Sequence, residues 1–119
     1  MRCIESPRGG KIALISDAGT PLISDPGFKL VRAAVAAGHA VVAVPGPSSV
    51  ITAMASSGLA TDAFFFSGFL PAKSQARRTR LSELKVIPGS LVMFEAPQRL
   101  AESLADMAEL LGARSAAVA

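Results

Sequence analysis

Residues 13–27, ALISDAGTPLISDPG, decide which fold this 119-residue chain is expected to adopt. A short apolar run, Ile12–Ile15, leads into a segment rich in Gly, Pro, Ser and Asp, which is typical of a buried strand that ends in a loop. After the loop, Phe28, Val31 and Val35 recur at helical spacing. This order predicts a strand–loop–helix unit.

Local signals also mark both ends of the predicted helix. Asp25 is expected to cap its N-terminus, because an Asp side chain can accept hydrogen bonds from the first free amides. Pro26 is expected in the first turn, where its missing N–H costs nothing. Gly38 is expected to end the helix, because glycine readily adopts the left-handed conformation found there.

A second strand–loop–helix unit follows the first. Residues 40–44 (AVVAV) are predicted to form another buried strand, which PGP at residues 45–47 ends. Ser48 or Ser49 then caps a helix that reaches residue 57. The residues predicted to face inward from this helix are Ile51, Met54 and Ala55. Two such units in succession predict an α/β fold with parallel strands and right-handed crossovers.

The second half of the chain differs in composition, because residues 63–69 hold four of the six phenylalanines. We therefore expect a boundary near residue 61, with residues 1–61 ending one α/β domain and residues 62–119 beginning another. The elements expected after the boundary are a basic loop and short helix over residues 73–85, a strand over 90–94, a helix over 100–111 and the start of a strand over 115–119. The last helix is indicated by Leu100, Leu104, Met107 and Leu111, with Gly112 at its end. Parallel sheets are normally covered on both faces, and an open sheet of only two strands cannot achieve this. The chain is therefore predicted to be an internal segment with an incomplete fold.

Composition excludes several classes of protein. Half of the residues are hydrophobic and the mean hydropathy is +0.45, which does not predict a disordered chain. The sequence has no run of about 18 apolar residues and no apolar segment near its start, so we expect neither a membrane span nor a signal peptide. A cytoplasmic location is therefore expected. One cysteine and one histidine do not predict a metal site.

The net charge of +3 comes from one short segment. Four of the twelve Lys and Arg residues lie within residues 73–80, which contain no acid, and the rest of the chain sums to −1. Such a cluster predicts a docking site for an anionic partner, although a solvated helix face is the simpler alternative. The residues of this basic cluster are Lys73, Arg77, Arg78 and Arg80.

The loops after the predicted strands favour a particular ligand chemistry. In open α/β sheets, ligands bind at the carboxyl ends of the strands. No cation lies between Ile12 and Phe28, but two acids do, Asp17 and Asp25, and neither glycine-rich phosphate motif is present. This loop therefore suits a cationic ligand, or one rich in hydrogen-bond donors, better than a polyphosphate. The simpler alternative is that both acids only make hydrogen bonds in turns and caps, and that the pair Ser48 and Ser49 only caps a helix.

Three groups of motifs together resemble the tetrapyrrole methylase superfamily. They are residues 13–27 with VPGPSS (44–49), GFLP (68–71) with the basic cluster after it, and FEAPQR (94–99). The resemblance is closest to the members that methylate the 2′-oxygen of a cytidine ribose in 16S ribosomal RNA. It covers residue 9 to the end and implies a two-domain α/β enzyme that binds S-adenosylmethionine in the cleft between its domains.

The resemblance also implies roles for individual residues. The cofactor is expected to contact the first loop, the second loop and the edge of the second domain, through Ala18, Gly19, Thr20, Ile23, Ser48, Ser49 and Glu95. Asp17 joins this set, because the sulfonium and ammonium groups of S-adenosylmethionine are cationic. The proton of the ribose hydroxyl needs an acceptor, for which the candidates are Asp17, Asp25 and Glu95. The basic cluster is then the expected contact with 16S rRNA in the small ribosomal subunit, and a homodimer is expected.

The chain also departs from the family pattern. The glycine-rich loop of the family's first strand is absent, and Gln98 stands where the family has a histidine. Two alternatives therefore stay open: a methyltransferase acting on a tetrapyrrole, and an inactive fragment that associates with itself through unpaired strand edges. A macrocycle enzyme has no need of the basic cluster. A dinucleotide-binding protein is disfavoured by the missing glycine motif.

Overall fold

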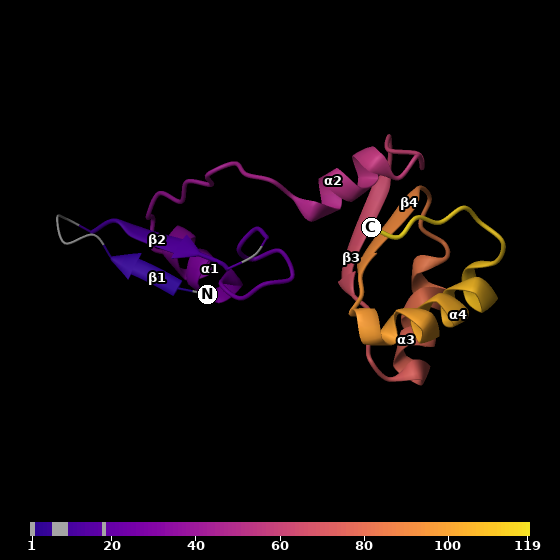
Figure 1. Cartoon of the computed structure of the whole chain (residues 1–119). Helices are drawn as coiled ribbons and strands as arrows, with labels where there is room; N and C mark the ends of the chain where they lie inside the picture. Colours follow the sequence, from indigo (N-terminus) through magenta and orange to yellow (C-terminus); the bar gives the residue numbers. More distant parts are fainter. Residues whose placement is uncertain (1, 6–9, 18) are drawn as a thin grey trace. The chain divides into compact units, whose positions relative to one another are not determined.

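The computed structural model describes residues 2–5, 10–17 and 19–119, which form two compact units, Met1–Ser49 and Val50–Ala119 (Figure 1). In neither unit do the described residues contain a helix long and apolar enough to cross a membrane.

The first unit begins with a strand pair. Strand β1 (Arg2–Glu5) pairs antiparallel with β2 (Ile12–Ile15), with Arg2 opposite Ile15 (Figure 1). The predicted strand is confirmed. The expectation of burial is wrong, because Ile12 is 63% exposed, and the expectation of parallel pairing is wrong in this unit, because the strand pair is antiparallel. The partner strand precedes β2 by only a few residues, and so short a connection permits only antiparallel pairing.

Helix α1 (Phe28–Ala36) confirms the predicted first helix. Gly38 ends it with φ of 78°, and its N–H donates to the carbonyl of Val35. The predicted start is wrong: Gly27 is the N-cap, and no side chain caps the helix. Asp25 lies too far upstream of the first turn to serve as its cap. The helix has no buried residue, and the apolar side chain of Phe28 is 60% exposed.

The predicted strand over residues 40–44 is absent from the structure. The side chains of Val42 and Val44 are 83% and 89% exposed. A strand needs a neighbour to satisfy its backbone N–H and C=O groups, and none of the described residues pairs with this segment. Its apolar composition alone therefore does not make it a strand.

Helix α2 (Ser49–Ser56) confirms the predicted second helix, and Met54 is buried as predicted. Val50 is also buried, whereas Ile51 and Ala55, which were expected to face inward, are exposed. Val50 and Met54 are four residues apart and so lie on the same side of the helix.

The second unit is built on a parallel strand–helix–strand crossover, which confirms the α/β class. Strand β3 (Phe64–Phe69) pairs in parallel with β4 (Ser90–Phe94), and helix α3 (Ser74–Leu84) connects them (Figure 1). The predicted strand over 90–94 is confirmed, and the helix expected within 73–85 fills most of that segment. The register shifts between Phe66 and Phe69, where Gly68 has φ of 69°.

The core of the second unit lies between α3, β4 and the last helix. Buried Leu70, Leu81 and Leu84 form its centre. A short 3-10 helix η1 (Pro97–Arg99) leads into α4 (Leu100–Leu111), which confirms the last predicted helix. The half-buried side chains that pack around the centre are Ile87, Leu91, Met93, Met107, Leu110 and Leu111.

The chain after α4 is not a strand. Gly112 ends the helix with φ of 76°, as predicted, but residues 115–119 have no strand conformation and Val118 is 66% exposed. As at residues 40–44, no neighbouring strand satisfies the backbone. The expected domain boundary near residue 61 stays a prediction, because a division into compact units does not locate the domains of a longer protein.

Candidate functional site

The loop between β2 and α1 holds its backbone in an unusual conformation. Leu22 and Ser24 have φ of 75° and 55°, in the left-handed region that costs a residue with a side chain roughly 1–2 kcal/mol. Within the loop, the N–H of Ile23 donates to the carbonyl of Thr20 at 3.2 Å, which closes a turn. Such conformations are concentrated at binding sites, where the strain orients specific groups.

Asp25 lies at the end of this loop and carries a buried acceptor atom. Its Oδ2 is inaccessible to solvent and has no hydrogen-bond partner among the residues that the structure describes. A buried carboxylate oxygen without a partner costs free energy, so it marks a place where a donor is missing.

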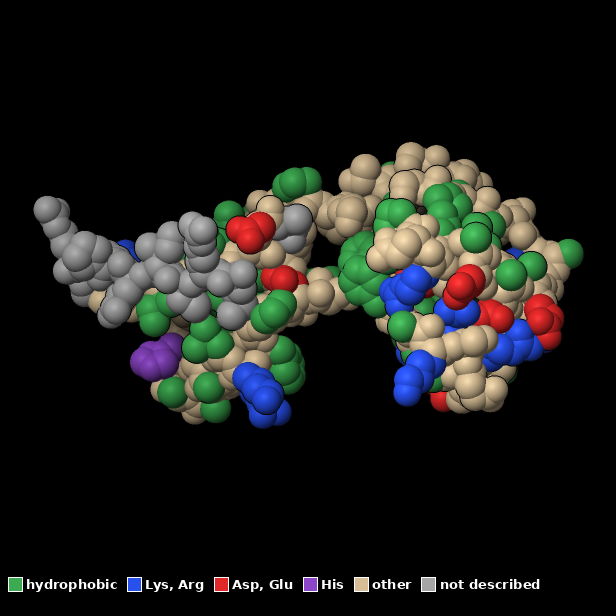
Figure 2. Space-filling view, turned by 60° about the horizontal axis from the view of Figure 1, so that its bottom comes forward, with side chains coloured by type: hydrophobic (Ala, Val, Ile, Leu, Met, Phe, Trp, Pro, Cys, Tyr) green, Lys and Arg blue, Asp and Glu red, His purple; other side chains and the backbone are tan. Residues whose placement is uncertain are grey.

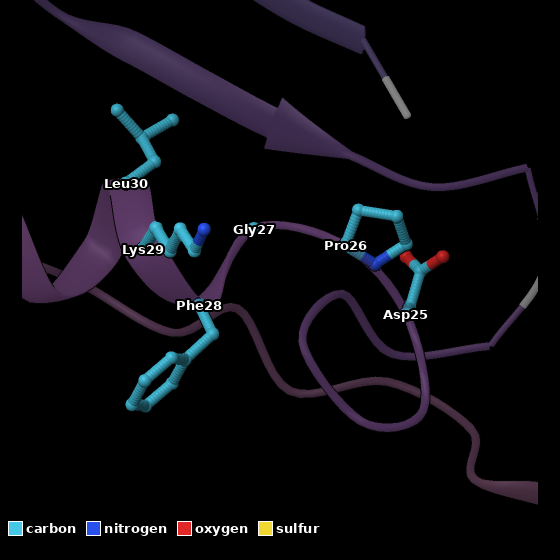
Figure 3. A pocket seen from close by; sticks show the side chains of 6 residues that line it. All are labelled: Asp25, Pro26, Gly27, Phe28, Lys29 and Leu30. Atoms are coloured by element: carbon cyan, nitrogen blue, oxygen red, sulfur yellow. The ribbon is translucent and has the colours of Figure 1, made fainter.

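An open pocket of about 470 Å³ adjoins this carboxylate (Figure 3). Apart from Asp25 and Lys29, its lining is apolar or glycine: Pro26, Gly27, Phe28 and Leu30. Figure 3 shows the Asp25 carboxylate beside the ring of Pro26, and the Lys29 side chain extending from α1 towards Gly27. The surface that these residues expose to the pocket is almost entirely apolar.

Asp25 was expected only as a candidate proton acceptor, and most of the predicted cofactor residues also belong to the first unit. Asp17, Gly19 and Thr20 are exposed in the loop after β2, and Ile23 is 52% exposed. Ser48 is half-buried, and Ser49 is the exposed first residue of α2. Ala18 lies outside the described residues. Asp17 and Asp25 therefore belong to the same loop of the first unit. Glu95 belongs to the second unit.

Glu95 follows the carboxyl end of β4, and three donors hold its carboxylate. Its Oε1 accepts the Ala96 N–H at 2.8 Å and pairs with Arg99 at 2.6 Å, and its Oε2 accepts the Ser103 hydroxyl at 2.5 Å. Its side chain is only 7% exposed. Burial by itself raises the pKa of Glu95, but the bonds from Ser103 and Ala96 and the charge of Arg99 outweigh it and leave that pKa below its usual value.

This arrangement makes Glu95 a structural acceptor for the turn that enters α4. A carboxylate with a lowered pKa and three bound donors is a poor proton acceptor. Sequence reasoning missed Ser103, which is fully buried. The four-residue spacing of Glu95 and Arg99 was the one local signal that could have indicated the ion pair.

The basic cluster is largely neutralised by acids of α4. Arg77 is 2% exposed; its Nε contacts Asp106 Oδ2 at 2.6 Å and its Nη2 lies 3.8 Å from Glu102. Its Nη1 also donates to the carbonyl of Ala72 at 3.3 Å. The structure thus gives Arg77, which was expected to contact RNA, a role in joining α3 to α4.

Arg78 takes part in the same network. Its Nη1 donates to Asp106 Oδ1 at 3.0 Å and to Glu109 Oε2 at 2.8 Å, and its Nη2 contacts Glu109 Oε1. These bonds raise the pKa of Arg78; those from Arg77 and Arg78 lower the pKa of Asp106, and those from Arg78 lower the pKa of Glu109. Most of the charged groups that face one another across this helix pair are therefore paired with each other.

Two members of the cluster remain more accessible. Arg80 pairs with Glu83 at 2.9 Å and lies 3.4 Å from the Ser67 hydroxyl, with 39% of its side chain exposed. Lys73 is exposed and has no ion-pair partner in the described part of the chain. Figure 2 shows Lys and Arg side chains interleaved with Asp and Glu on one face of this unit. Over residues 50–119, seven basic residues stand against six acidic ones, a formal charge of +1.

Within residues 2–5, 10–17 and 19–119, no group of three or more His, Cys, Asp or Glu side chains is placed to hold a metal ion.

Comparison with known proteins gives a consistent result. The chain is 54% identical over 119 residues to a protein of Mesorhizobium japonicum, 54% over 118 residues to one of Pseudomonas aeruginosa and 56% over 110 residues to one of Xylella fastidiosa. Each is named ribosomal RNA small subunit methyltransferase I. These alignments cover 92–98% of this chain but 40–42% of the relatives, so the chain spans about two fifths of their length.

The sequence profile of the tetrapyrrole (corrin/porphyrin) methylases matches residues 3–119. That span includes the loop that ends at Asp25 and the parallel strand–helix unit of the second half. The chain therefore belongs to the tetrapyrrole (corrin/porphyrin) methylase family.

Proposed function

We propose that this chain is part of an S-adenosylmethionine-dependent methyltransferase that modifies ribosomal RNA of the small subunit. The observation that carries the proposal is the identity of 54% or more, over nearly the whole chain, to relatives named for that activity. Ribosomal RNA is then the macromolecular partner, and the bacterial cytoplasm, where ribosomes are found, is the place of action.

The chemistry of the loop after β2 supports the cofactor assignment. When bound, S-adenosylmethionine supplies a methyl group on a cationic sulfonium. The loop offers Asp17 and Asp25 and contains no cation, and Asp25 Oδ2 lacks a donor among the described residues. Gly19, Thr20, Ile23, Ser48 and Ser49 are the further residues that we propose to hold the cofactor, together with Ala18.

The proton of the ribose hydroxyl needs an acceptor, and the candidates differ in their surroundings. Glu95 is held by three donors, so we propose that it positions the turn into α4 and takes no proton. Asp17 is exposed at the start of the loop, and Asp25 has one free buried oxygen. The proton acceptor is therefore sought in the first unit.

We propose that the RNA contacts the more accessible part of the basic cluster. Lys73 is exposed, and phosphates can replace the acidic partners of Arg78 and Arg80, which are partly exposed. Contacts of this kind weaken steeply as the salt concentration rises. Arg77 is buried, and its proposed role is to hold α3, which carries these residues, against α4.

The names of the relatives favour ribosomal RNA over a tetrapyrrole as the substrate. Self-association is supported by a separate observation. The sheet of the second unit has two strands, and Phe64, Phe65 and Phe69 of β3 are 37–55% exposed. Apolar edges of this kind recruit partners, so we propose that copies of the chain form homodimers. Size-exclusion chromatography at two concentrations tests this, and an unchanged monomer at both would contradict it.

Calorimetric titration of S-adenosylmethionine into the chain, with S-adenosylhomocysteine as the comparison ligand, tests the cofactor proposal. Micromolar binding that Asp17→Ala abolishes is the expected result. Asp62→Ala, at an exposed acid of the second unit, is the matched control and should bind normally. A folded chain that binds neither ligand would show that this segment does not hold the cofactor by itself.

A further inference from the structure

Arg78 differs from the other members of the basic cluster in the way that its guanidinium is held. Its Nη1 donates to Asp106 Oδ1 at 3.0 Å, and Asp106 also binds the buried Arg77 through Oδ2 at 2.6 Å. The side chain of Asp106 is only 12% exposed, so this anchor is largely covered by the α3–α4 pair. Because a guanidinium is planar and rigid, anchoring it on one side restricts the direction of its remaining N–H groups.

Glu109 occupies the more exposed side of this guanidinium. Nη1 donates to Glu109 Oε2 at 2.8 Å and Nη2 contacts Glu109 Oε1, so both carboxylate oxygens are bound. The side chains of Arg78 and Glu109 are 30% and 65% exposed, which leaves the pair accessible to solvent. Arginine binds a phosphate in the same way, through two N–H groups and two oxygens. The carboxylate of Glu109 therefore occupies a site whose donors also suit a phosphate.

The two acids that bind Arg78 differ in how readily another anion can replace them. Asp106 is mostly covered and is shared with Arg77, so its loss would leave a buried charge without a partner. Glu109 is largely exposed, and its partner in the described part of the chain is Arg78. Exposed ion pairs contribute little to stability, so an anion can replace Glu109 at a small cost in free energy.

We propose that Glu109 occupies a phosphate site of the RNA surface and competes with the RNA for the guanidinium of Arg78. The inference rests on the proposed function, because that function supplies the RNA. When RNA binds, two phosphate oxygens accept the N–H groups that Glu109 accepted before, and the Glu109 carboxylate turns to solvent. Asp106 keeps the guanidinium in place during this exchange. Glu109 thus lowers the affinity of the site for RNA.

Two substitutions on α4 that remove the same charge separate this competition from a general change in net charge. Glu109→Gln removes the carboxylate that binds Arg78. Glu102→Gln is the matched control, because Glu102 is 74% exposed on the same helix and lies 3.8 Å from Arg77 rather than against Arg78. Filter binding of a small-subunit rRNA fragment measures the affinity of each variant at about 0.1 M salt. Far-UV circular dichroism checks folding.

We expect Glu109→Gln to raise RNA affinity by about three- to fivefold, because the phosphate no longer competes with a carboxylate. Glu102→Gln should raise it by less than about 1.5-fold, since charges exposed at the surface are screened over about 10 Å at this salt concentration. The Arg78→Gln variant lacks the guanidinium for which the two anions compete. In that background, Glu109→Gln should gain no more affinity than Glu102→Gln does.

Two results would overturn the inference while leaving the proposed function intact, because the wild-type chain would still bind the RNA. The first is no gain for Glu109→Gln, or a gain equal to that of Glu102→Gln, which would mean that only net charge matters. The second is a gain that persists in the Arg78→Gln background, which would mean that Glu109 acts on another group.

If the wild-type chain does not bind the rRNA fragment, the proposed RNA contact fails for this segment, and inorganic pyrophosphate then tests the anion site by itself. The Nε–H signal of Arg78, identified by its loss in Arg78→Gln, is followed by NMR during the titration. A shift that needs about threefold less pyrophosphate in Glu109→Gln than in Glu102→Gln would keep the anion site and overturn RNA as its ligand. No shift, or equal shifts in both variants, would overturn the site as well.

Discussion

The loop after β2 and the α3–α4 helix pair differ in whether their buried acidic groups have partners. In the loop, Asp25 keeps a buried oxygen without a partner among the described residues. In the helix pair, Asp106 is shared by Arg77 and Arg78, each within 3.0 Å. Removing one partner of a buried ion pair destabilises the fold, whereas a buried charged group that the chain leaves unsatisfied indicates a ligand.

The largest effect is expected from Arg77→Ala. The change leaves Asp106 with one partner fewer in a mostly buried site and removes a side chain that is 2% exposed. Breaking such a pair costs about 3 kcal/mol or more of unfolding free energy. Urea unfolding followed by circular dichroism measures it, because the chain has no Trp or Tyr for fluorescence.

Lys73→Ala is the control for that experiment, because Lys73 is exposed at the start of the same helix and should change stability by less than about 0.5 kcal/mol. Similar small losses of unfolding free energy for both variants, together with weaker RNA binding by Arg77→Ala, would contradict the structural role. Arg77 would then be a contact with RNA.

A smaller effect, about 1–2 kcal/mol, is expected from Glu95→Gln, because hydrogen bonds to a charged acceptor are weakened. The pKa of Glu95 is lowered in the folded state, so its contribution is present above its unfolded pKa of about 4.3 and is lost as the pH falls through the folded pKa. Wild-type stability should therefore fall between about pH 5 and pH 3.

Glu95→Gln should fall less steeply over that range, because one of the groups that take up protons has been removed. Asp106 and Glu109, whose pKa values are also lowered, keep a residual slope in the variant. Urea midpoints measured across the range give both slopes. Identical slopes would mean that the Glu95 carboxylate is not held by Ser103 and Arg99 in solution.

Features that depend on neighbouring residues could be predicted from the sequence, whereas features that depend on residues distant in the sequence could not. The helix Phe28–Ala36 and its stop at Gly38 follow from neighbouring residues, and both were predicted. Residues 40–44 look like a strand, but a strand depends on a partner elsewhere, and none pairs with them among the described residues.

The site shows the same limit. The absence of cations from the loop pointed to Asp17 and Asp25, and the family motif at residues 94–99 pointed to Glu95. The basic cluster looked unpaired, because its acidic partners lie on another helix, and Arg77 and Asp106 are 29 residues apart in the sequence. Only the structure could show that Glu95 is saturated and that Asp25 has a free oxygen.

RNA binding gives a third test, with a smaller expected effect. If Lys73 contacts a phosphate, Lys73→Ala should reduce the slope of log affinity against log salt by about one. Filter binding of a small-subunit rRNA fragment at several salt concentrations measures the slope. Lys85→Ala, at another exposed lysine close to α3, is the control. An unchanged slope for Lys73→Ala would place the RNA elsewhere.

The smallest effect is expected from Glu83→Gln, which frees Arg80 from its partner at 2.9 Å. The pair is one helical turn apart and largely exposed, so the unfolding free energy should change by less than about 0.5 kcal/mol. RNA affinity should rise slightly at low salt, because a phosphate no longer competes with Glu83 for the guanidinium. The same filter-binding assay measures this change. A stability loss as large as that of Arg77→Ala would mean that the exposed and buried pairs are equivalent, and the division between ligand-facing and structural charges would fail on this helix.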